Sequence, residues 1–180
     1  MSKLKNIRTM TICAMLLALS VILGFLKIVV IPNVVEIRLS PLPIAMGGGL
    51  FGPVIGMVIG ALSDIVGFIA KPTGAYFPGF TISSAVGGLI FGICLRNKKG
   101  KITLTRIIIA EILYAVIVGM FFNTLNLTIL THGDFKTLFF ARLFKEVAMT
   151  PVNTLLLWIV IEPINVFYRK NLSQTSEIID

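Results

Sequence analysis

Long apolar runs, broken by Pro, Gly or clustered charge, are the feature that most constrains this chain. A stretch of about 20 apolar residues matches the hydrocarbon thickness of a bilayer, and several such stretches follow one another here. Of the 180 residues, 56% are hydrophobic and only 13% are charged, and the mean hydropathy is +0.96. These values lie outside the range of soluble globular domains. The sequence therefore predicts an all-α integral membrane protein.

The breaks between the runs predict a compact bundle of six transmembrane helices. These cover residues 9–31, 41–52, 53–70, 78–95, 104–127 and 140–167. The second is too short to cross a bilayer alone, although Gly52-Pro53 offers a turn after it.

Both ends of the chain carry their own expectations. The N-terminal run resembles a signal peptide, but it is long enough for a full crossing and lacks a small-x-small cleavage site, so we expect a retained helix. A single six-helix transmembrane domain is expected over residues 1–170, followed by a polar, frayed tail over residues 171–180.

Basic residues give the chain a net charge of +8, and they gather in three clusters. Clusters of this kind are typical of cytoplasmic loops and tails rather than of a nucleic-acid-binding surface. With six helices all three clusters share one side, which predicts cytoplasmic N- and C-termini in a multi-pass plasma-membrane protein. The clusters are Lys3, Lys5 and Arg8; Arg96, Lys98, Lys99, Lys101 and Arg106; and Arg169 and Lys170.

The sequence offers no constellation for catalysis or metal binding. His132 is the only histidine, and no cysteine or suitably spaced carboxylate accompanies it. Cys13 and Cys94 lie within apolar runs, where a thiol behaves as a small hydrophobe. No Walker A sequence is present. We therefore expect no enzyme activity, no cofactor and no ATP hydrolysis by the chain itself.

Small residues recur at a spacing of four on two predicted helices. Ala14 and Ala18 form one such ridge, and Gly52, Gly56 and Gly60 form another that continues to Asp64. Such ridges let helix backbones approach closely in lipid. They indicate packing within this chain or, for Ala14 and Ala18, docking to another membrane subunit.

Two predicted outer loops carry groups that suit ligand binding. The segment PNVVEIRLSPLP would present Glu36 and Arg38 on one face if it is extended. The segment KPTGAYFPGF places Tyr76, Phe77 and Phe80 among prolines and glycines. These rings form either an interfacial aromatic belt or a shaped wall for a flat ligand.

The segment ARLFKE places three charges at the mouth of the last predicted helix. Arg142, Lys145 and Glu146 lie three or four residues apart and therefore on neighbouring faces. A charge in hydrocarbon costs at least about 2.5–3.5 kcal/mol, so these groups lie near water or face a polar cavity. Either they snorkel, or the two cations hold an anionic substrate group while a carboxylate binds its other end. The candidate carboxylates are Glu36, Asp64 and Glu146; Asn123 and Asn126 are candidates for neutral hydrogen bonds.

The run VEIRLSPLPIAMGGGLFGPVIGMVIGALSDIVGFIAKPTGAYFPGFTIS, together with ARLFKE before TPVNTLLL, resembles a known family. It is similar to the substrate-binding S components of energy-coupling factor vitamin transporters, specifically the folate type. The resemblance covers nearly the whole chain. It implies a six-helix bundle that binds one vitamin with high affinity and transports it only when joined to a transmembrane coupling subunit and two cytoplasmic ATPases.

The resemblance also implies roles for particular residues. Ala14 and Ala18 match the small-residue pair that contacts the coupling subunit, and residues 32–41 and 71–79 match the lid loops. Folate suits the residue types, because a pterin stacks on rings, its aminopyrimidine edge donates to a carboxylate, and its glutamate tail needs cations. The expected substrate-binding residues are Glu36, Arg38, Asp64, Tyr76, Phe77, Phe80, Asn126, Arg142, Lys145 and Glu146.

Three other interpretations stay open at this point. The nearest is an S component for riboflavin, thiamine or pantothenate, which ligand binding distinguishes. Another is a small channel or structural membrane subunit, in which the glycines only pack helices and the charges only snorkel. The third is a membrane-embedded hydrolase, which the single histidine disfavours.

Overall fold

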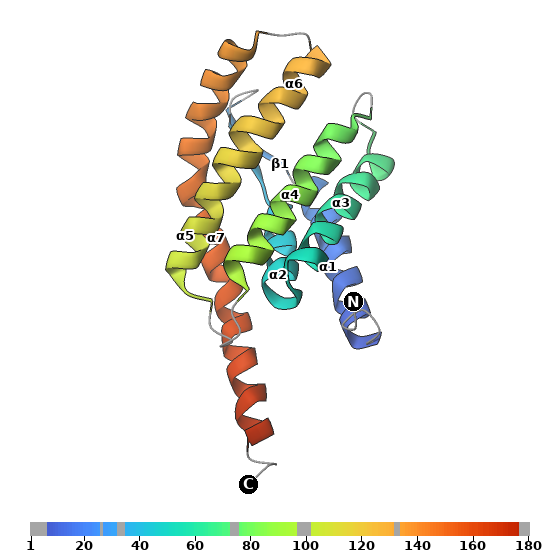
Figure 1. Ribbon diagram of the computed structural model, residues 1–180, viewed down its shortest axis with the longest axis vertical. Helices are drawn as coiled ribbons and strands as arrows, with labels where there is room; N and C mark the ends of the chain where they lie inside the picture. The colour runs from blue at the N-terminus through green and yellow to red at the C-terminus, as the bar shows by residue number, and fades with distance from the viewer. Residues whose placement is uncertain are drawn as a thin grey trace.

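The computed structural model describes residues 7–25, 27–31, 35–72, 76–96, 102–131 and 134–176, and this part of the chain forms a helical bundle (Figure 1). Within the described residues its helices form six rods, meaning six continuous helical segments, as the apolar runs predict. The all-α membrane bundle is therefore confirmed, with one small addition: a two-stranded hairpin joins the first two helices.

The first predicted helix is too long at its C-terminal end. Helix α1 covers Ile7–Phe25, and Lys27–Ile31 forms strand β1, which pairs antiparallel with β2 at Val35–Arg38. The register sets Lys27 opposite Arg38. Residues 28–31 are Ile-Val-Val-Ile, and such β-branched side chains favour a strand over a helix. Hydropathy alone does not distinguish a strand from a helix in this segment.

The next three helices match their predicted positions closely. Helices α2, α3 and α4 cover Pro41–Phe51, Pro53–Ala70 and Pro78–Leu95, each with a proline in its first turn. Proline is favoured there because its fixed φ suits a helix start and its missing N–H is not needed. Between α2 and α3, Gly52 adopts a φ of 107°, which an L side chain rarely adopts.

The last two rods extend beyond the predicted bounds. Helix α5 (Leu104–Leu113), the π-helical segment η2 (Tyr114–Phe122) and α6 (Asn123–Thr131) follow one another without a break. Helix α7 covers Phe135–Ser176, so the expected frayed tail is helical as far as Ser176. Residues 177–180 lie outside the described part.

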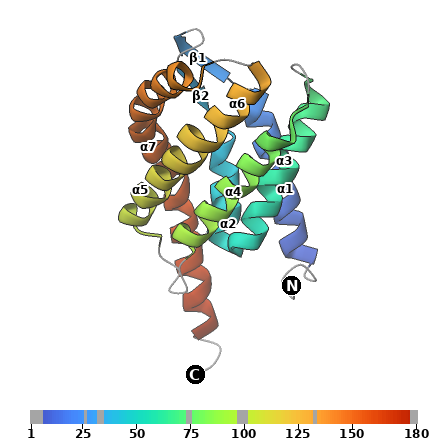
Figure 2. The same cartoon turned by 45° about the horizontal axis from the view of Figure 1, so that its top comes forward.

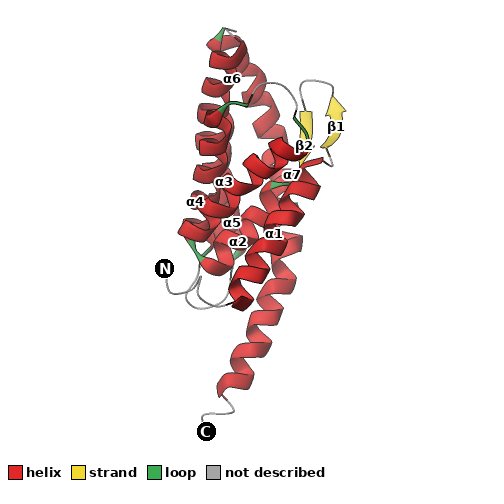
Figure 3. Cartoon of the chain, turned by 90° about the vertical axis from the view of Figure 1, so that its right-hand side faces the viewer, coloured by secondary structure: helices red, strands yellow, loops and turns green. Residues whose placement is uncertain are grey.

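The two ends of the helix bundle carry different segments of the chain. The hairpin, the start of α4 and the start of α7 lie toward one end, whereas α1 begins and α7 ends toward the other (Figures 1 and 2). A view from the side shows the hairpin beside the upper part of the bundle (Figure 3). The cytoplasmic placement of both termini stays a prediction.

Glycines bring α2, α3 and α4 into backbone contact at the centre of the bundle. A Cβ atom at Gly56 would lie within 2.8 Å of the Gly48 Cα and against the carbonyl oxygen of Gly88. A second apolar core, which includes Phe91, Ile107 and Leu157, joins α4, α5 and α7. The glycine ridge of α3 therefore packs within this chain.

Length and apolar composition allow four of the described helices to cross a membrane. They are Pro53–Ala70, Pro78–Leu95, Leu104–Leu130 and Phe135–Glu162. Thr9–Phe25 and Pro41–Phe51 are shorter apolar helices. The expectation of a weak second span agrees with the short α2.

Candidate ligand-binding cavity

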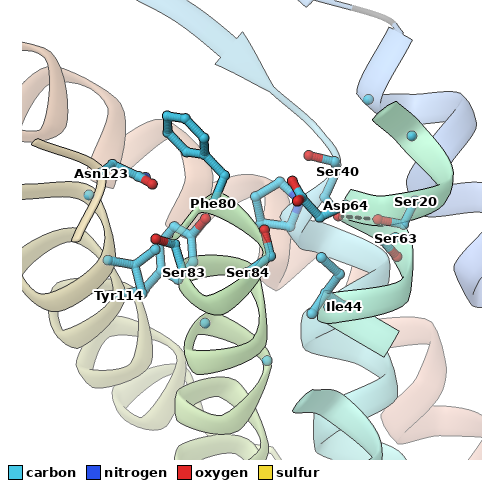
Figure 4. Close-up of a pocket in the computed structure, with 18 of the residues that line it drawn as sticks. Ser20, Ser40, Ile44, Ser63, Asp64, Phe80, Ser83, Ser84, Tyr114 and Asn123 are labelled. Carbon is cyan, nitrogen blue, oxygen red and sulfur yellow. Dashed lines mark hydrogen bonds between the residues drawn. The ribbon is translucent and has the colours of Figure 1, made fainter. Parts of the chain in front are cut away.

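A cavity of about 430 Å³ opens among the helices, with walls from α1, α2, α3, α4, η2 and α7. Figure 4 shows Asp64, Ser63, Ser20 and Ser40 on one side of it, and Tyr114 with Asn123 on the other. Residues of α4, among them Phe80 and Ser84, lie between these two groups. A cavity of this size is within the range of small-molecule sites.

The wall formed by α1, α2 and α3 is polar. The hydroxyl of Ser20 donates to the carbonyl oxygen of Ser40 at 2.9 Å. Asp64 lies on α3, where its Oδ2 accepts a hydrogen bond from the Thr81 hydroxyl at 2.7 Å. The Ser63 hydroxyl is buried and has no partner in the described part of the protein. Because an unsatisfied buried hydroxyl is costly, this wall is suited to a polar ligand or water.

Aromatic rings line the cavity next to the start of α4. Tyr76, Phe77 and Phe80 all contribute to this part of the wall. The rings of Phe77 and Phe80 lie 6.0 Å apart at 74°, an edge-to-face pair. Deeper in the bundle Tyr114 stacks on Phe91 at 4.9 Å and 25°. Flat faces are therefore available to a planar ligand.

The wall formed by α7 carries the three charges of ARLFKE. Arg142, Lys145 and Glu146 all line the cavity, and Met149 and Asn153 continue the same helix face. The Glu146 carboxylate lies against Gly119 of η2, where a Cβ would come within 2.9 Å of both of its oxygens. These three side chains are only half-buried, which keeps their charges near the aqueous cavity rather than in lipid.

The two asparagines have different positions. Asn123 lines the cavity, whereas Asn126 does not. The Asn126 side chain is buried and donates to the Ser83 hydroxyl at 2.9 Å, and Ser83 itself donates to the Gly79 carbonyl oxygen at 2.9 Å. In this structure Asn126 supports the cavity wall behind Ser83 instead of facing the cavity.

The remaining predicted residues either lie outside the described part of the structure or do not line the cavity. Glu36 and Arg38 belong to β2, but their side chains lie outside the described part. So do residues 32–34 and 73–75 of the predicted lid loops. Ala14 and Ala18 are exposed on α1 and do not line the cavity.

Sequence reasoning missed several groups at this site. Lys71, Tyr114 and the serines at 20, 40, 63, 83 and 84 line the cavity, and Thr81 bonds a residue that does. Serine is too common for any one of these to stand out. A clearer signal was available for Glu111, the lone charge between RIII and ILYAVIV, which is only 2% exposed but does not line the cavity.

No group of three His, Cys, Asp or Glu side chains that could hold a metal ion occurs among the described residues. His132 is not among them. Cys13 and Cys94 are half-buried free thiols in α1 and α4. The chemistry on offer at the cavity is therefore hydrogen bonding, charge pairing and stacking.

Two curated proteins are similar to this chain over most of its length. Folate transporter FolT from Clostridium novyi (strain NT) is 35% identical over 155 residues, which cover 86% of this chain and 88% of the relative. Folate transporter FolT from Leuconostoc mesenteroides subsp. mesenteroides is 26% identical over 150 residues, which cover 81% of this chain and 80% of that protein.

A solved structure shares the fold. The crystal structure of FolT bound with folic acid superposes with a TM-score of 0.75 at 24% sequence identity, covering 85% of this chain and 92% of that one. The model of the family described as "ECF transporter, substrate-specific component" matches residues 8–171. This multi-pass membrane protein belongs to the substrate-specific component family of energy-coupling factor transporters.

Proposed function

We propose that this chain binds folate with high affinity and serves as the substrate-capturing subunit of an importer. One observation carries the proposal: a single cavity joins the carboxylate of Asp64, a set of aromatic rings, and the cations Arg142 and Lys145. A folate molecule has matching parts, namely an aminopyrimidine edge that donates, a flat pterin, and an anionic glutamate tail.

Each part of the cavity then has a role. Arg142 and Lys145 bind the glutamate carboxylates through charge-assisted hydrogen bonds. Tyr76, Phe77 and Phe80 provide the stacking faces, and Asp64 or Glu146 accepts from the aminopyrimidine edge. Glu36 and Arg38 bind from the hairpin, and Asn126 contributes by holding Ser83 in the wall.

The relatives support the choice of vitamin. The two similar curated proteins are named folate transporters, and the structurally similar FolT was solved with folic acid bound. Thiamine and pantothenate fit the cavity's chemistry less well. Thiamine is cationic and would be repelled by Arg142 and Lys145, whereas pantothenate has no flat ring.

Uphill transport needs an energy source outside this chain. We expect the termini to be cytoplasmic and the cavity to open outward, with residues 32–41 and 71–79 covering the bound vitamin. A transmembrane coupling subunit docks on Ala14 and Ala18, and two cytoplasmic ATPases drive release to the inside. Both alanines are exposed on α1, as such docking requires.

Isothermal titration of the detergent-purified chain tests the proposal. Folate, riboflavin, thiamine and pantothenate are titrated in parallel. Tight binding of folate alone supports it, and tight binding of another vitamin keeps the transporter role but replaces the substrate. Binding of none would favour a channel or a structural subunit and contradict the proposal.

A further inference from the structure

Three side chains, from α3, α4 and the segment just before α4, form a continuous hydrogen-bond chain that ends at the cavity. Thr81 lies in the first turn of α4, and its hydroxyl donates to Asp64 Oδ2 in α3 at 2.7 Å. The same hydroxyl is 2.8 Å from the hydroxyl of Tyr76. Asp64 and Tyr76 line the cavity, whereas Thr81 does not. Any influence of Thr81 on a ligand is therefore exerted through its neighbours.

The direction of the chain follows from proton counting. An ionised carboxylate only accepts, so Thr81 uses its single hydroxyl proton on Asp64. The Thr81 oxygen can then only accept from Tyr76, whose phenol is the donor of the outer bond. Donors aligned in this way polarise one another, which strengthens both hydrogen bonds.

The outer end of the chain has a second attachment. The Tyr76 ring lies 5.2 Å from the ring of Phe68 at 56°, and Phe68 is one turn beyond Asp64 on α3. Tyr76 is thus held to α3 by two routes: its hydroxyl through Thr81 to Asp64, and its ring through contact with Phe68. This arrangement fixes the orientation of the Asp64 carboxylate at the polar wall.

We propose that Thr81 is a positioning residue that orients the Asp64 carboxylate toward a ligand edge bearing N–H donors, with the Tyr76 hydroxyl as its outer support. This inference rests on the proposed folate binding and specifies how the cavity would recognise the pterin end. Thr81 then determines selectivity for donor-bearing heteroaromatic ligands, although it touches none of them.

The test compares two ligands that differ in one donor group. Folic acid and its 2-desamino analogue are titrated into the wild type and four variants: Asp64→Asn, Thr81→Val, Thr81→Ser and Tyr76→Phe. The readout is the dissociation constant of the analogue divided by that of folic acid. A general loss of packing weakens both ligands alike and leaves this ratio unchanged, whereas misdirection of the carboxylate lowers it.

We expect Thr81→Val to weaken folic acid binding about tenfold, the scale of one hydrogen bond to a charged group, while affecting the analogue far less. Thr81→Ser restores the hydroxyl and should restore the ratio, and Tyr76→Phe should lower it to a smaller extent. The matched control is Thr128→Val in α6, because that hydroxyl bonds to the Thr124 carbonyl of its own helix and Thr128 does not line the cavity. Its ratio should equal that of the wild type.

The outcomes separate this inference from the proposed function. If the wild type binds no folic acid, the proposed function fails first. If Asp64→Asn lowers the ratio and Thr81→Val does not, folate binding stands and the positioning role is overturned. Equal weakening of both ligands by Thr81→Val, or an unchanged ratio in Asp64→Asn, also overturns it. If Thr81→Val does not fold, Tyr76→Phe decides, since it removes only the outer hydroxyl of an exposed residue.

Discussion

The backbone of Gly88 in α4 lies directly against the carbonyl oxygen of Gly56 in α3, so that a Cβ atom at position 88 would overlap that oxygen. Neither atom belongs to a movable side chain, and a methyl group there can be accommodated only if the helices separate. Because these two helices carry Asp64 and Phe80, which both line the cavity, their close approach also sets the width of the cavity.

Gly88→Ala should therefore destabilise the protein by about 1–3 kcal/mol or more, the range for overpacked cores. Gly67→Ala is the matched control, since nothing lies within 4 Å of a Cβ at Gly67 and alanine favours the helix. Thermal unfolding in detergent without ligand measures both. Similar melting temperatures for the two variants would contradict the backbone contact.

These glycines illustrate what the sequence can predict. A spacing of four on a long apolar run requires one helix face made of small residues, so the packing of Gly56 and Gly60 follows from the pattern. The proline starts of α2, α3 and α4 are equally local signals, which is why these helices match their predicted bounds. Features that depend on neighbouring residues along the chain can be found this way.

The parts that sequence reasoning missed depend on contacts between distant segments. The bond from Thr81 to Asp64 joins residues 17 apart, and that from Asn126 to Ser83 joins residues 43 apart. Nothing in either local sequence marks these threonine and serine hydroxyls as partners. The β-hairpin was missed for another reason: Lys27–Ile31 is apolar enough to continue a helix, and only its β-branched content favours a strand.

The buried bond between Asn126 and Ser83 should behave as one energetic unit. Asn126→Ala and Ser83→Ala each remove one side of it, and each should lower stability by about 1–3 kcal/mol. The double variant should lose less stability than the sum of the two single losses, because the first change has already broken the bond that the second one affects. Melting temperatures of all three variants give the coupling, and strict additivity would mean that the two side chains do not support each other.

Arg142 and Lys145 should be required for binding of an anionic ligand. Arg142→Ala and Lys145→Ala should each weaken folate binding about 10–100-fold, the scale of a lost charge-assisted hydrogen bond. Lys136→Ala is the control, because Lys136 is exposed on the same helix and does not line the cavity. Titration calorimetry measures all three. Equal affinity in the two cavity variants and the control would leave the charges with a snorkelling role only.

Glu111 should be replaceable without loss of stability. It is buried in α5, where an ionised carboxylate is unfavourable. Glu111→Gln keeps the shape, carries no ionisable group and should raise the melting temperature by a few degrees. Glu162→Gln, at an exposed position of α7, should change it little. A marked loss in Glu111→Gln would show that the charge itself is needed at this position.

Bulk on the exposed face of α1 should separate binding from transport. Ala14→Trp and Ala18→Trp place large rings where the coupling subunit is proposed to dock, at exposed positions that do not line the cavity. Folate affinity of the purified chain should stay at the wild-type value, whereas folate uptake by cells that coexpress the partner subunits should be lost.

Val116→Trp controls for the ring itself, because Val116 is 52% exposed on η2, a different face of the bundle. Its uptake should match that of the wild type. Small side chains permit close helix approach in lipid, so a tryptophan at a docking ridge prevents contact where the same ring facing lipid does not. Normal uptake in both Ala14→Trp and Ala18→Trp would exclude α1 as the docking surface. Loss of folate binding in these two variants would instead indicate a disturbed helix bundle.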